Sequence, residues 1–303
     1  MYCGVDLGGT KIEIIVLSQA NDVLFRQRIA TPQGNYAKTL EAIFFLFRQA
    51  EAEVGHLSAL GVGIPGAISL KTRRIKNANS VCLIGQDLKG DLEQQLRRPV
   101  RLANDANCFA LSEAIDGAGQ VGQTVFGVII GTGCGGGLIV DGQPLNGCNS
   151  IAGEWGHNPL PWMTDDDQAL SCYCGKKGCL ETFVSGPGFS KHFESWFSLS
   201  MTPQQMVAVS QHTDNPFYEQ ANQAIERYCE WLAKGLASVI NLFDPDVIVL
   251  GGGMSNIEVL YQRVPDLWQD WVFSDSINTQ LHKAQWGDSS GVRGAAWLVK
   301  DIC

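Results

Sequence analysis

The chain has 303 residues, enough for two domains of ordinary size or one large one. Apolar residues make up 45% of it and charged residues 17%, which is typical of a well-packed globular protein and excludes extensive disorder. The formal net charge of −9 argues against a surface for nucleic acid or for an anionic membrane. Any anionic ligand must be held by local groups, because the overall field opposes it.

The first residues lead directly into a polar motif at Asp6, with no basic region followed by an apolar core, so we expect no secretory signal. The longest uncharged apolar stretch, 125–140, is too short to span a bilayer and contains six glycines. We therefore expect a cytoplasmic protein. Because the cytosol keeps thiols reduced, most of the ten cysteines are expected to be small buried residues or incidental thiols, without a disulfide framework.

The opening motif places glycines before the β-branched segment 12–17, which is typical of a strand. A dinucleotide-binding or Walker-type glycine loop leads into a helix, so these glycines predict a hairpin turn instead. Glycines let backbone N–H groups approach phosphate oxygens. The Thr10 hydroxyl and the Lys11 ammonium group would add donors, and the Asp6 carboxylate could hold Mg²⁺ through water. An ordinary β-turn is the alternative. The residues concerned are Asp6, Gly8, Gly9, Thr10 and Lys11.

Further along, strands alternate with helices, which predicts an α/β protein. Two glycine-turned hairpins, one near the start of each half, suggest a duplicated architecture that faces a shared cleft. We expect an N-terminal domain over 1–117 and a C-terminal domain over 118–303, with a final helix at about 290–300 that packs back on the first. The predicted helices are 36–54, 106–114 and 216–243, the last capped by Asn215; the predicted strands include 60–64, 100–103, 124–130, 138–140 and 247–250.

Three further segments could contact ligands. The glycine turn at Gly131, Thr132 and Gly133 could cradle phosphates. A second glycine-rich segment follows a predicted strand and could lie against a nucleotide ring. It comprises Gly251, Gly252, Gly253 and Met254. Asn104 and Asp105 separate a strand from a helix. One of them could simply cap the helix, or Asp105 could accept the proton of an attacking hydroxyl, since a helix N-terminus favours the ionised form.

A histidine and three clustered cysteines form the most specific local motif. His157, Cys172, Cys174 and Cys179 supply the four ligands of a closed tetrahedral zinc site, and the intervening glycines permit the turns that bring them together. With no open position for water, the Zn²⁺ would be structural. Glu154 and Glu181 flank the motif and could accept hydrogen bonds from sugar hydroxyls, or could be solvated loop residues.

Taken together, these motifs resemble the ROK family of sugar kinases and repressors. The resemblance rests on residues 6–11, 104–107, 131–133 and 154–157 and on the Cys-x-Cys-Gly-x-x-Gly-Cys run, which occur in that family's order over nearly the whole chain. It implies the actin-like ATPase fold, with two α/β domains of the ribonuclease-H type around a central cleft. It also implies that Asp105 is the catalytic base.

The resemblance further implies roles for individual residues. Those expected to line the sugar site are Gly66, Asn79, Asn104, Asp105, Glu154, His157 and Glu181, and His157 would both ligate zinc and face the sugar. Those expected to meet the phosphates are Gly9, Thr10, Lys11, Thr132 and Gly133, with Gly252 and Gly253 at the adenosine. The implied reaction is transfer of the γ-phosphoryl group of ATP, with Mg²⁺, in a protein that is expected to be a homodimer.

Within the family, residues 76–80, 153–163 and 287–298 look most like bacterial fructokinases, including those that also accept mannose. We therefore expect fructose as the substrate and fructose 6-phosphate as the product. N-acetylglucosamine kinase and glucokinase are the alternatives. A sugar-sensing repressor of the same family is the non-enzymatic alternative; such proteins carry a DNA-binding segment before the kinase-like domain, and here that domain starts almost at Met1.

Overall fold

The computed structural model describes residues 1–78 and 80–303, and these form two compact units. Unit 1 comprises Met1–Gln120, Gly137–Ala152 and Gln285–Cys303. Unit 2 comprises Val121–Gly136 and Gly153–Ala284. The chain thus leaves unit 1 after its first 120 residues and ends there with its last segment.

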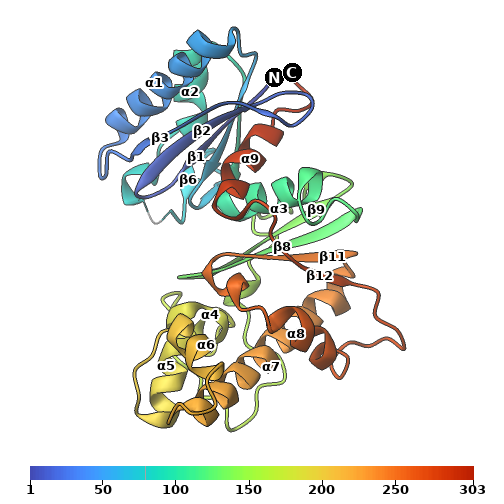
Figure 1. Cartoon of the computed structure of the whole chain (residues 1–303). Helices are drawn as coiled ribbons and strands as arrows, with labels where there is room; N and C mark the ends of the chain where they lie inside the picture. Colours follow the sequence, from blue (N-terminus) through green and yellow to red (C-terminus); the bar gives the residue numbers. More distant parts are fainter. Residues whose placement is uncertain (79) are drawn as a thin grey trace. The chain divides into compact units, whose positions relative to one another are not determined.

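A five-stranded sheet forms the centre of unit 1, in the order β3-β2-β1-β4-β7 (Figure 1). The first three strands are antiparallel, and β4 and β7 then run parallel to β1. Their bounds are β1 Tyr2–Leu7, β2 Lys11–Leu17, β3 Val23–Ala30, β4 Leu60–Ile64 and β7 Val100–Asn104. A two-stranded sheet pairs β5 Ala67–Ile68 with β6 Ile75–Lys76.

The sequence pattern did not reveal β3, which we interpreted as part of a polar stretch. It is an edge strand with little buried surface, and Arg26, Gln27 and Arg28 interrupt its apolar residues, so it does not show the regular alternation by which strands are usually predicted. Ion pairs hold it to β2 instead, because Arg26 and Arg28 both bind the buried carboxylate of Glu13. The long-range pairing of these charges could not be predicted from local spacing.

Helices cover both faces of this sheet. α1 and α2 lie on one face, and α3 and α9 on the other (Figure 1). Asn35 caps α1 by accepting a hydrogen bond from the Lys38 N–H group at 3.0 Å. The bounds are α1 Tyr36–Val54, α2 Leu88–Leu96, α3 Asp105–Asp116 and α9 Ser290–Trp297, with short 3₁₀ turns η1 Val81–Leu83 and η4 Gly287–Ser289. The predicted helix over 36–54 is confirmed, and the predicted final helix ends three residues early, at Trp297.

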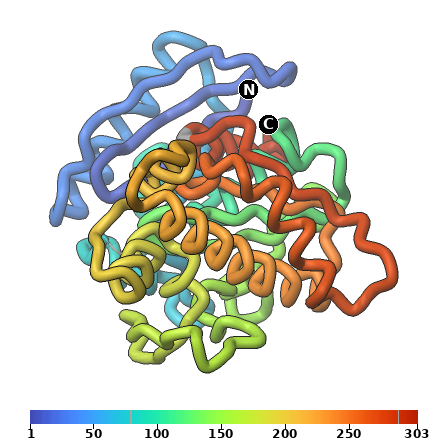
Figure 2. The backbone as a smooth tube through the Cα atoms, turned by 60° about the horizontal axis from the view of Figure 1, so that its bottom comes forward, coloured from blue at the N-terminus to red at the C-terminus, as the bar shows by residue number. Residues whose placement is uncertain are grey.

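α9 lies unusually close to its neighbours in unit 1. A Cβ atom at Gly61 in β4 would be 1.8 Å from the carbonyl oxygen of Ala295, and one at Gly294 would be 1.7 Å from that of Cys108 in α3. Glycine is therefore the residue that permits this backbone-to-backbone packing. As a result the last residues return to the first strand, and the two chain ends lie side by side (Figures 1 and 2).

We predict that Gly61→Ala destabilises the protein by about 3 kcal/mol, because the added methyl group meets backbone that cannot rotate away. Urea unfolding measures the change. Gly34→Ala is the control: nothing lies within 4 Å of its Cβ position, and only its left-handed backbone (φ 71°) opposes the substitution, at about 1 kcal/mol. Equal effects of the two substitutions would contradict the importance of the α9 contact.

Unit 2 contains most of the second five-stranded sheet, whose order is β10-β9-β8-β11-β12. β8 and β12 run parallel to β11, and β10 is antiparallel to β9. The bounds are β8 Thr124–Ile130, β9 Cys134–Val140, β10 Gln143–Pro144, β11 Val247–Gly251 and β12 Gln280–Lys283. The strand order repeats that of the first sheet, with the β8–β9 turn in the place of the β1–β2 turn, so the expected duplication of topology is confirmed.

The long helix α7 organises the helical part of unit 2. Its aromatic residues Tyr228 and Trp231 are fully buried, which confirms that they belong to the core. The helix begins at Tyr218, so the prediction of Pro216 was two residues too early: Asn215 accepts a hydrogen bond from the Phe217 N–H group and forms a turn there instead. The helices are α4 Glu181–Val184, α5 Gly186–Phe197, α6 Pro203–Ser210, α7 Tyr218–Phe243 and α8 Leu260–Trp268, with 3₁₀ turns η2 Trp155–His157 and η3 Gly253–Asn256.

None of the helices in the described part of the chain combines the length and the apolar character that a bilayer crossing requires.

Candidate active site and metal centre

Side chains that follow β3 donate hydrogen bonds to backbone carbonyl groups of the β1–β2 turn in unit 1. The Thr31 hydroxyl donates to the Gly8 carbonyl at 2.8 Å, and the Gln33 amide donates to that of Gly9 at 3.3 Å. The turn closes with a hydrogen bond from Gly8 N–H to the Lys11 carbonyl at 3.0 Å. These contacts confirm the predicted hairpin. Thr31 and Gln33, which follow β3, have no local motif that could have identified them.

The structure decides which residue caps α3. The Asn104 side chain accepts a hydrogen bond from the Asn107 N–H group at 2.8 Å, so Asn104 is the N-cap. Asp105 is the exposed first residue of the helix, and its Oδ1 accepts from Ala106 N–H at 2.8 Å. The capping role is thereby assigned to Asn104, and the carboxylate of Asp105 lies where the helix dipole favours its ionised form.

Asp6, at the end of β1, lies in an acidic environment. Loss of water contact, followed by the negative charges of Asp105 and Glu13, raises the pKa of Asp6 to about 6, and Lys11 and Arg28 only partly offset this. Two carboxylates that repel each other in this way favour the approach of a cation. The pair therefore has the character expected of a Mg²⁺-nucleotide site.

Gly66, the remaining described residue of the predicted sugar site in unit 1, occupies a position that glycine alone fits. It has a φ of 89°, and a Cβ atom there would be 2.6 Å from the Lys76 carbonyl oxygen. It therefore lets residues 76–78 pass close to the end of β4. Asn79, also predicted for the sugar site, lies outside the described residues.

We predict that Asp6→Asn stabilises the protein at pH 8, without nucleotide or Mg²⁺, by about 1–3 kcal/mol. Since the folded chain raises the pKa of Asp6, the stabilising contribution of this group is complete below pH 4 and is lost as the pH rises through 6. The neutral amide avoids that loss, so the two proteins should be equally stable near pH 4. Chemical unfolding at both pH values tests this.

Asp275→Asn, which removes an exposed carboxylate in unit 2, controls for the change in net charge. An identical pH-dependent gain in this control, or a gain in Asp6→Asn that does not change with pH, would contradict the assigned pKa.

In unit 2, Glu181 and the segment 154–157, both predicted for the sugar site, lie against Cys134, the first residue of β9. The Cys134 N–H group donates to the Glu181 carboxylate at 3.0 Å. On the other side, a Cβ atom at Gly156 would be 2.3 Å from the Cys134 carbonyl oxygen, so the segment that carries Glu154 and His157 lies directly against the strand. Both the carboxylate of Glu181 and the segment that carries Glu154 and His157 therefore lie next to Cys134.

Glycine turns predicted to hold the nucleotide also meet within unit 2. The 131–133 turn closes with a hydrogen bond from Gly131 N–H to the Gly133 carbonyl at 2.9 Å. The Gly186 N–H group donates to the Gly131 carbonyl at 2.8 Å. Gly252, with a φ of 82°, approaches so closely that a Cβ atom there would be 2.4 Å from the Ile130 carbonyl oxygen. A surface formed by backbone alone is suited to phosphates and to a flat ring.

Gly186 was not identified from the sequence, although it contributes the N-terminus of α5. That end of the helix lies beside the 131–133 turn, where its dipole favours an anion. Thr132 is exposed at the tip of the turn, whereas Gly251 and the side chain of Met254 are buried.

The four predicted zinc ligands form one cluster. Their ligand atoms all lie within 4.8 Å of one another. The Cys174 and Cys179 sulfur atoms are 3.5 Å apart, and the Cys172 sulfur is 3.7 Å from His157 Nδ1. Ligands at about 2.3 Å from a central Zn²⁺ in tetrahedral geometry are separated by about 3.8 Å, so the cluster fits this ion.

The surrounding residues orient the cluster. Gly175 and Gly178 have φ values of 87° and 71°, which provide the predicted tight turns between the cysteines. His157 Nε2 lies 3.0 Å from the Tyr173 hydroxyl, which leaves Nδ1 on the side of the sulfur atoms. A second partner of this kind fixes the orientation and tautomer of a ligating histidine.

We predict about one zinc per chain in protein purified without chelator, and its loss in Cys172→Ser. Because the cluster ties loop 157–179 together, loss of zinc should lower the melting temperature by about 5–10 °C. Metal analysis and thermal unfolding measure both effects. Cys148→Ser, at an exposed thiol outside the cluster, should change neither. A stable, folded protein without zinc would refute the assignment.

Comparison with known proteins agrees with the fold and with the site. The model of the ROK family matches residues 2–302, so the chain belongs to the ROK family. Among curated relatives, the N-acetyl-D-glucosamine kinase of Pectobacterium carotovorum is 38% identical and that of Vibrio cholerae also 38%, each over 98% of this chain and over 98% and 99%, respectively, of the relative.

Solved structures of the family show the same architecture. A ROK hexokinase from Thermus thermophilus has a TM-score of 0.85 at 30% identity, with 99% of both chains covered. A ROK family glucokinase from Streptomyces griseus, solved with glucose and AMPPNP, has a TM-score of 0.75 at 28% identity, again over 99% of both chains. The predicted actin-like ATPase fold is confirmed.

Proposed function

We propose that the protein is an ATP-dependent hexose kinase in which Asp105 is the general base. The observation that carries this proposal is the arrangement at α3: Asn104 provides the helix cap, and the exposed Asp105 carboxylate interacts with Asp6 at the end of β1. A base and a second carboxylate suited to Mg²⁺ thus lie beside the glycine turn predicted to bind phosphate.

In the proposed reaction, a sugar hydroxyl attacks the γ-phosphorus of ATP, the bond to the β-phosphate oxygen breaks, and ADP leaves. Asp105 accepts the hydroxyl proton as the new oxygen–phosphorus bond forms. The turn 8–11 and the turn 131–133 hold the phosphates, while bound Mg²⁺ would neutralise their charge. Since phosphoryl transfer requires mainly positioning and charge neutralisation, rigid backbone turns are sufficient for much of this work.

The relatives support N-acetylglucosamine as the sugar, with N-acetylglucosamine 6-phosphate as the product. The two relatives described above carry this activity in their names and align over 98% of this chain. This was the alternative in the sequence analysis, and the relatives support it better than fructose. The predicted sugar-site residues Glu154, His157 and Glu181 are the proposed acceptors for its hydroxyl groups; Glu181 and the segment that carries the other two lie against Cys134.

Fructose remains the second candidate because of segments 153–163 and 287–298, which resemble bacterial fructokinases. The first of these carries Glu154 and His157 and lies against β9. The segment that resembles fructokinases thus carries two of the residues proposed to contact the sugar.

We predict ATP-dependent phosphorylation with the highest kcat/KM for N-acetylglucosamine among N-acetylglucosamine, fructose, mannose, glucose and N-acetylmannosamine. Asp105→Asn should lower kcat by at least about 100-fold, because the amide cannot accept the proton. A coupled ADP assay with mass analysis of the sugar phosphate measures both.

Asp275→Asn serves as the matched control and should retain full activity. A clear preference for fructose would overturn the sugar assignment and leave the kinase assignment intact. Binding of a sugar without any phosphorylation would overturn the kinase assignment in favour of a sensor.

A further inference from the structure

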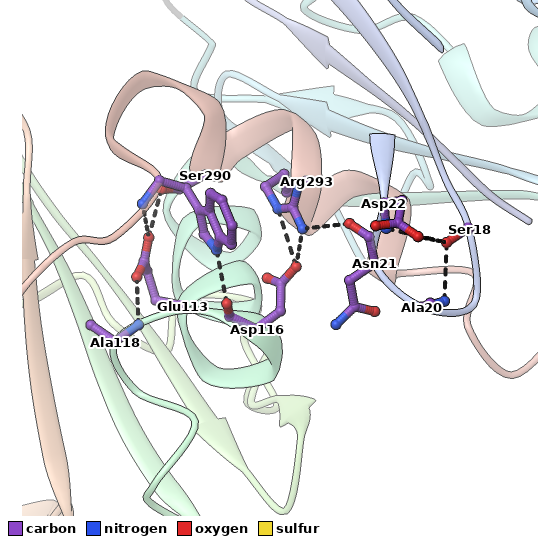
Figure 3. A network of polar contacts seen from close by, with 10 residues as sticks. Ser18, Ala20, Asn21, Asp22, Glu113, Asp116, Ala118, Ser290 and Arg293 are labelled. Atoms are coloured by element: carbon purple, nitrogen blue, oxygen red, sulfur yellow. Dashed lines mark hydrogen bonds and ion pairs between the residues drawn. The ribbon is translucent and has the colours of Figure 1, made fainter. Parts of the chain in front are cut away.

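Glu113, near the end of α3, is a fully buried carboxylate with an unusual set of donors. Oε2 accepts hydrogen bonds from the N–H groups of Ala118 and Gln285, both at 3.0 Å. Oε1 accepts from Trp286 N–H at 3.2 Å and from the Ser290 hydroxyl at 2.8 Å. Figure 3 shows Glu113 between Ala118 and Ser290, so one side chain joins two segments that are far apart in sequence.

These donors lie where the chain passes between the two units. Ala118 is three residues before Val121, the first residue of unit 2, and the Glu113 carbonyl also accepts from Gly119 N–H at 2.8 Å. Gln285 is the first residue after the return from unit 2. The chain passes from one unit to the other at four places. Glu113 forms hydrogen bonds with unit 1 residues next to two of these places.

A second buried pair reinforces the returning segment. The Arg293 guanidinium donates to the Asp116 carboxylate, and its centre lies 4.0 Å from the centroid of the Trp286 ring (Figure 3 shows Arg293 with Asp116). The Trp286 indole N–H group donates to the Asp116 carbonyl at 3.0 Å. The end of α3 thus fixes both the backbone and a side chain of residue 286, which makes Glu113 part of a rigid anchor and not an isolated contact.

We propose that Glu113 is a positioning residue of the kinase: it fixes the two chain crossings to the helix that carries Asp105 at its other end. This inference rests on the proposed function, in which Asp105, at the start of the same helix, is the general base. If the crossings are loosened, a smaller fraction of the protein is competent to bind. The apparent affinity for both substrates then falls by that same fraction.

The chemistry of the site makes a sharp test possible. Each oxygen of Glu113 faces at least one backbone N–H group, so a glutamine at this position presents its NH₂ group to a backbone donor in either orientation of the amide. Glu113→Gln therefore breaks at least one of the three hydrogen bonds from backbone N–H groups while it keeps the size and shape of the side chain.

We expect Glu113→Gln to speed hydrogen exchange of the Ala118, Gln285 and Trp286 amides by about tenfold relative to the unaltered chain. In the steady state, KM for the sugar and KM for ATP should both rise about tenfold, with kcat at saturation within about twofold. A variant that merely loses active protein by irreversible unfolding has a lower kcat and unchanged KM values, and reversible global unfolding speeds exchange at all amides of the chain, not at these three alone.

Glu93→Gln is the matched control. Its carboxylate accepts one backbone hydrogen bond, from Val100 N–H, in the same unit and away from the crossings, so neither exchange at the three amides nor KM should change. Ser290→Ala removes one donor from Oε1 and should act in the same direction as Glu113→Gln, with smaller effects. It supplies the test if Glu113→Gln does not fold.

Unchanged exchange at these three amides in both Glu113→Gln and Ser290→Ala would overturn the anchor, whatever the activity. Faster exchange with both KM values unchanged would overturn the positioning role. Exchange can be measured without substrates, so failure of the proposed function, seen as absence of phosphorylation in the unaltered chain, is distinguishable from failure of this inference.

Discussion

The rest of unit 1 depends on the close contact of α9 with α3 and with the first sheet. The backbones of these elements are so close that a single added methyl group would overlap with them. Steric repulsion between backbone atoms therefore fixes the positions of the elements, and rotation of side chains cannot relieve it. Gly61 and Gly294 make this approach possible. The position of α3 is fixed in turn, and with it the location of Asp105 at its first turn.

The duplicated strand order explains why the ligand-binding candidates occur in two sets. In each sheet a glycine turn connects the first two strands of an antiparallel hairpin, and the parallel strands follow on the other side. The turns at 8–11 and 131–133 therefore occupy equivalent places in two similar sheets. Each turn is fixed by residues from elsewhere in its own unit, Thr31 in one case and Gly186 in the other.

Sequence reasoning succeeded where a function requires a residue type with narrow geometry. Four soft ligands at short spacing have few uses other than a metal site, and the structure brings their ligand atoms within 4.8 Å. It did not distinguish Asn104 from Asp105 as the helix cap, because both residue types cap well and only the contact with Asn107 decides between them. Thr31, Gln33 and Glu113 are ordinary residues locally, and their roles arise from contacts that are distant in sequence.

The sugar could not be predicted with the same clarity as the fold. Backbone turns and ligand clusters depend on a few residues each, whereas the selection of one hexose over another depends on the combined shape of several loops, including the segment around Glu154. Edge strands such as β3 were missed for a related reason. Their stability comes from pairing with a neighbour, and in this chain from Arg26 and Arg28 around the buried Glu13, which no local pattern reveals.

The return of α9 to the first sheet also governs the order in which the protein can be completed during synthesis. Ribosomes release a chain from its N-terminus, yet the core of unit 1 requires residues 290–297, which emerge after the whole of unit 2. Unit 2 consists of Val121–Gly136 and Gly153–Ala284 and has all its residues earlier. The first 120 residues therefore lack α9, and with it part of the cover on one face of their sheet, until residues 290–297 have been translated.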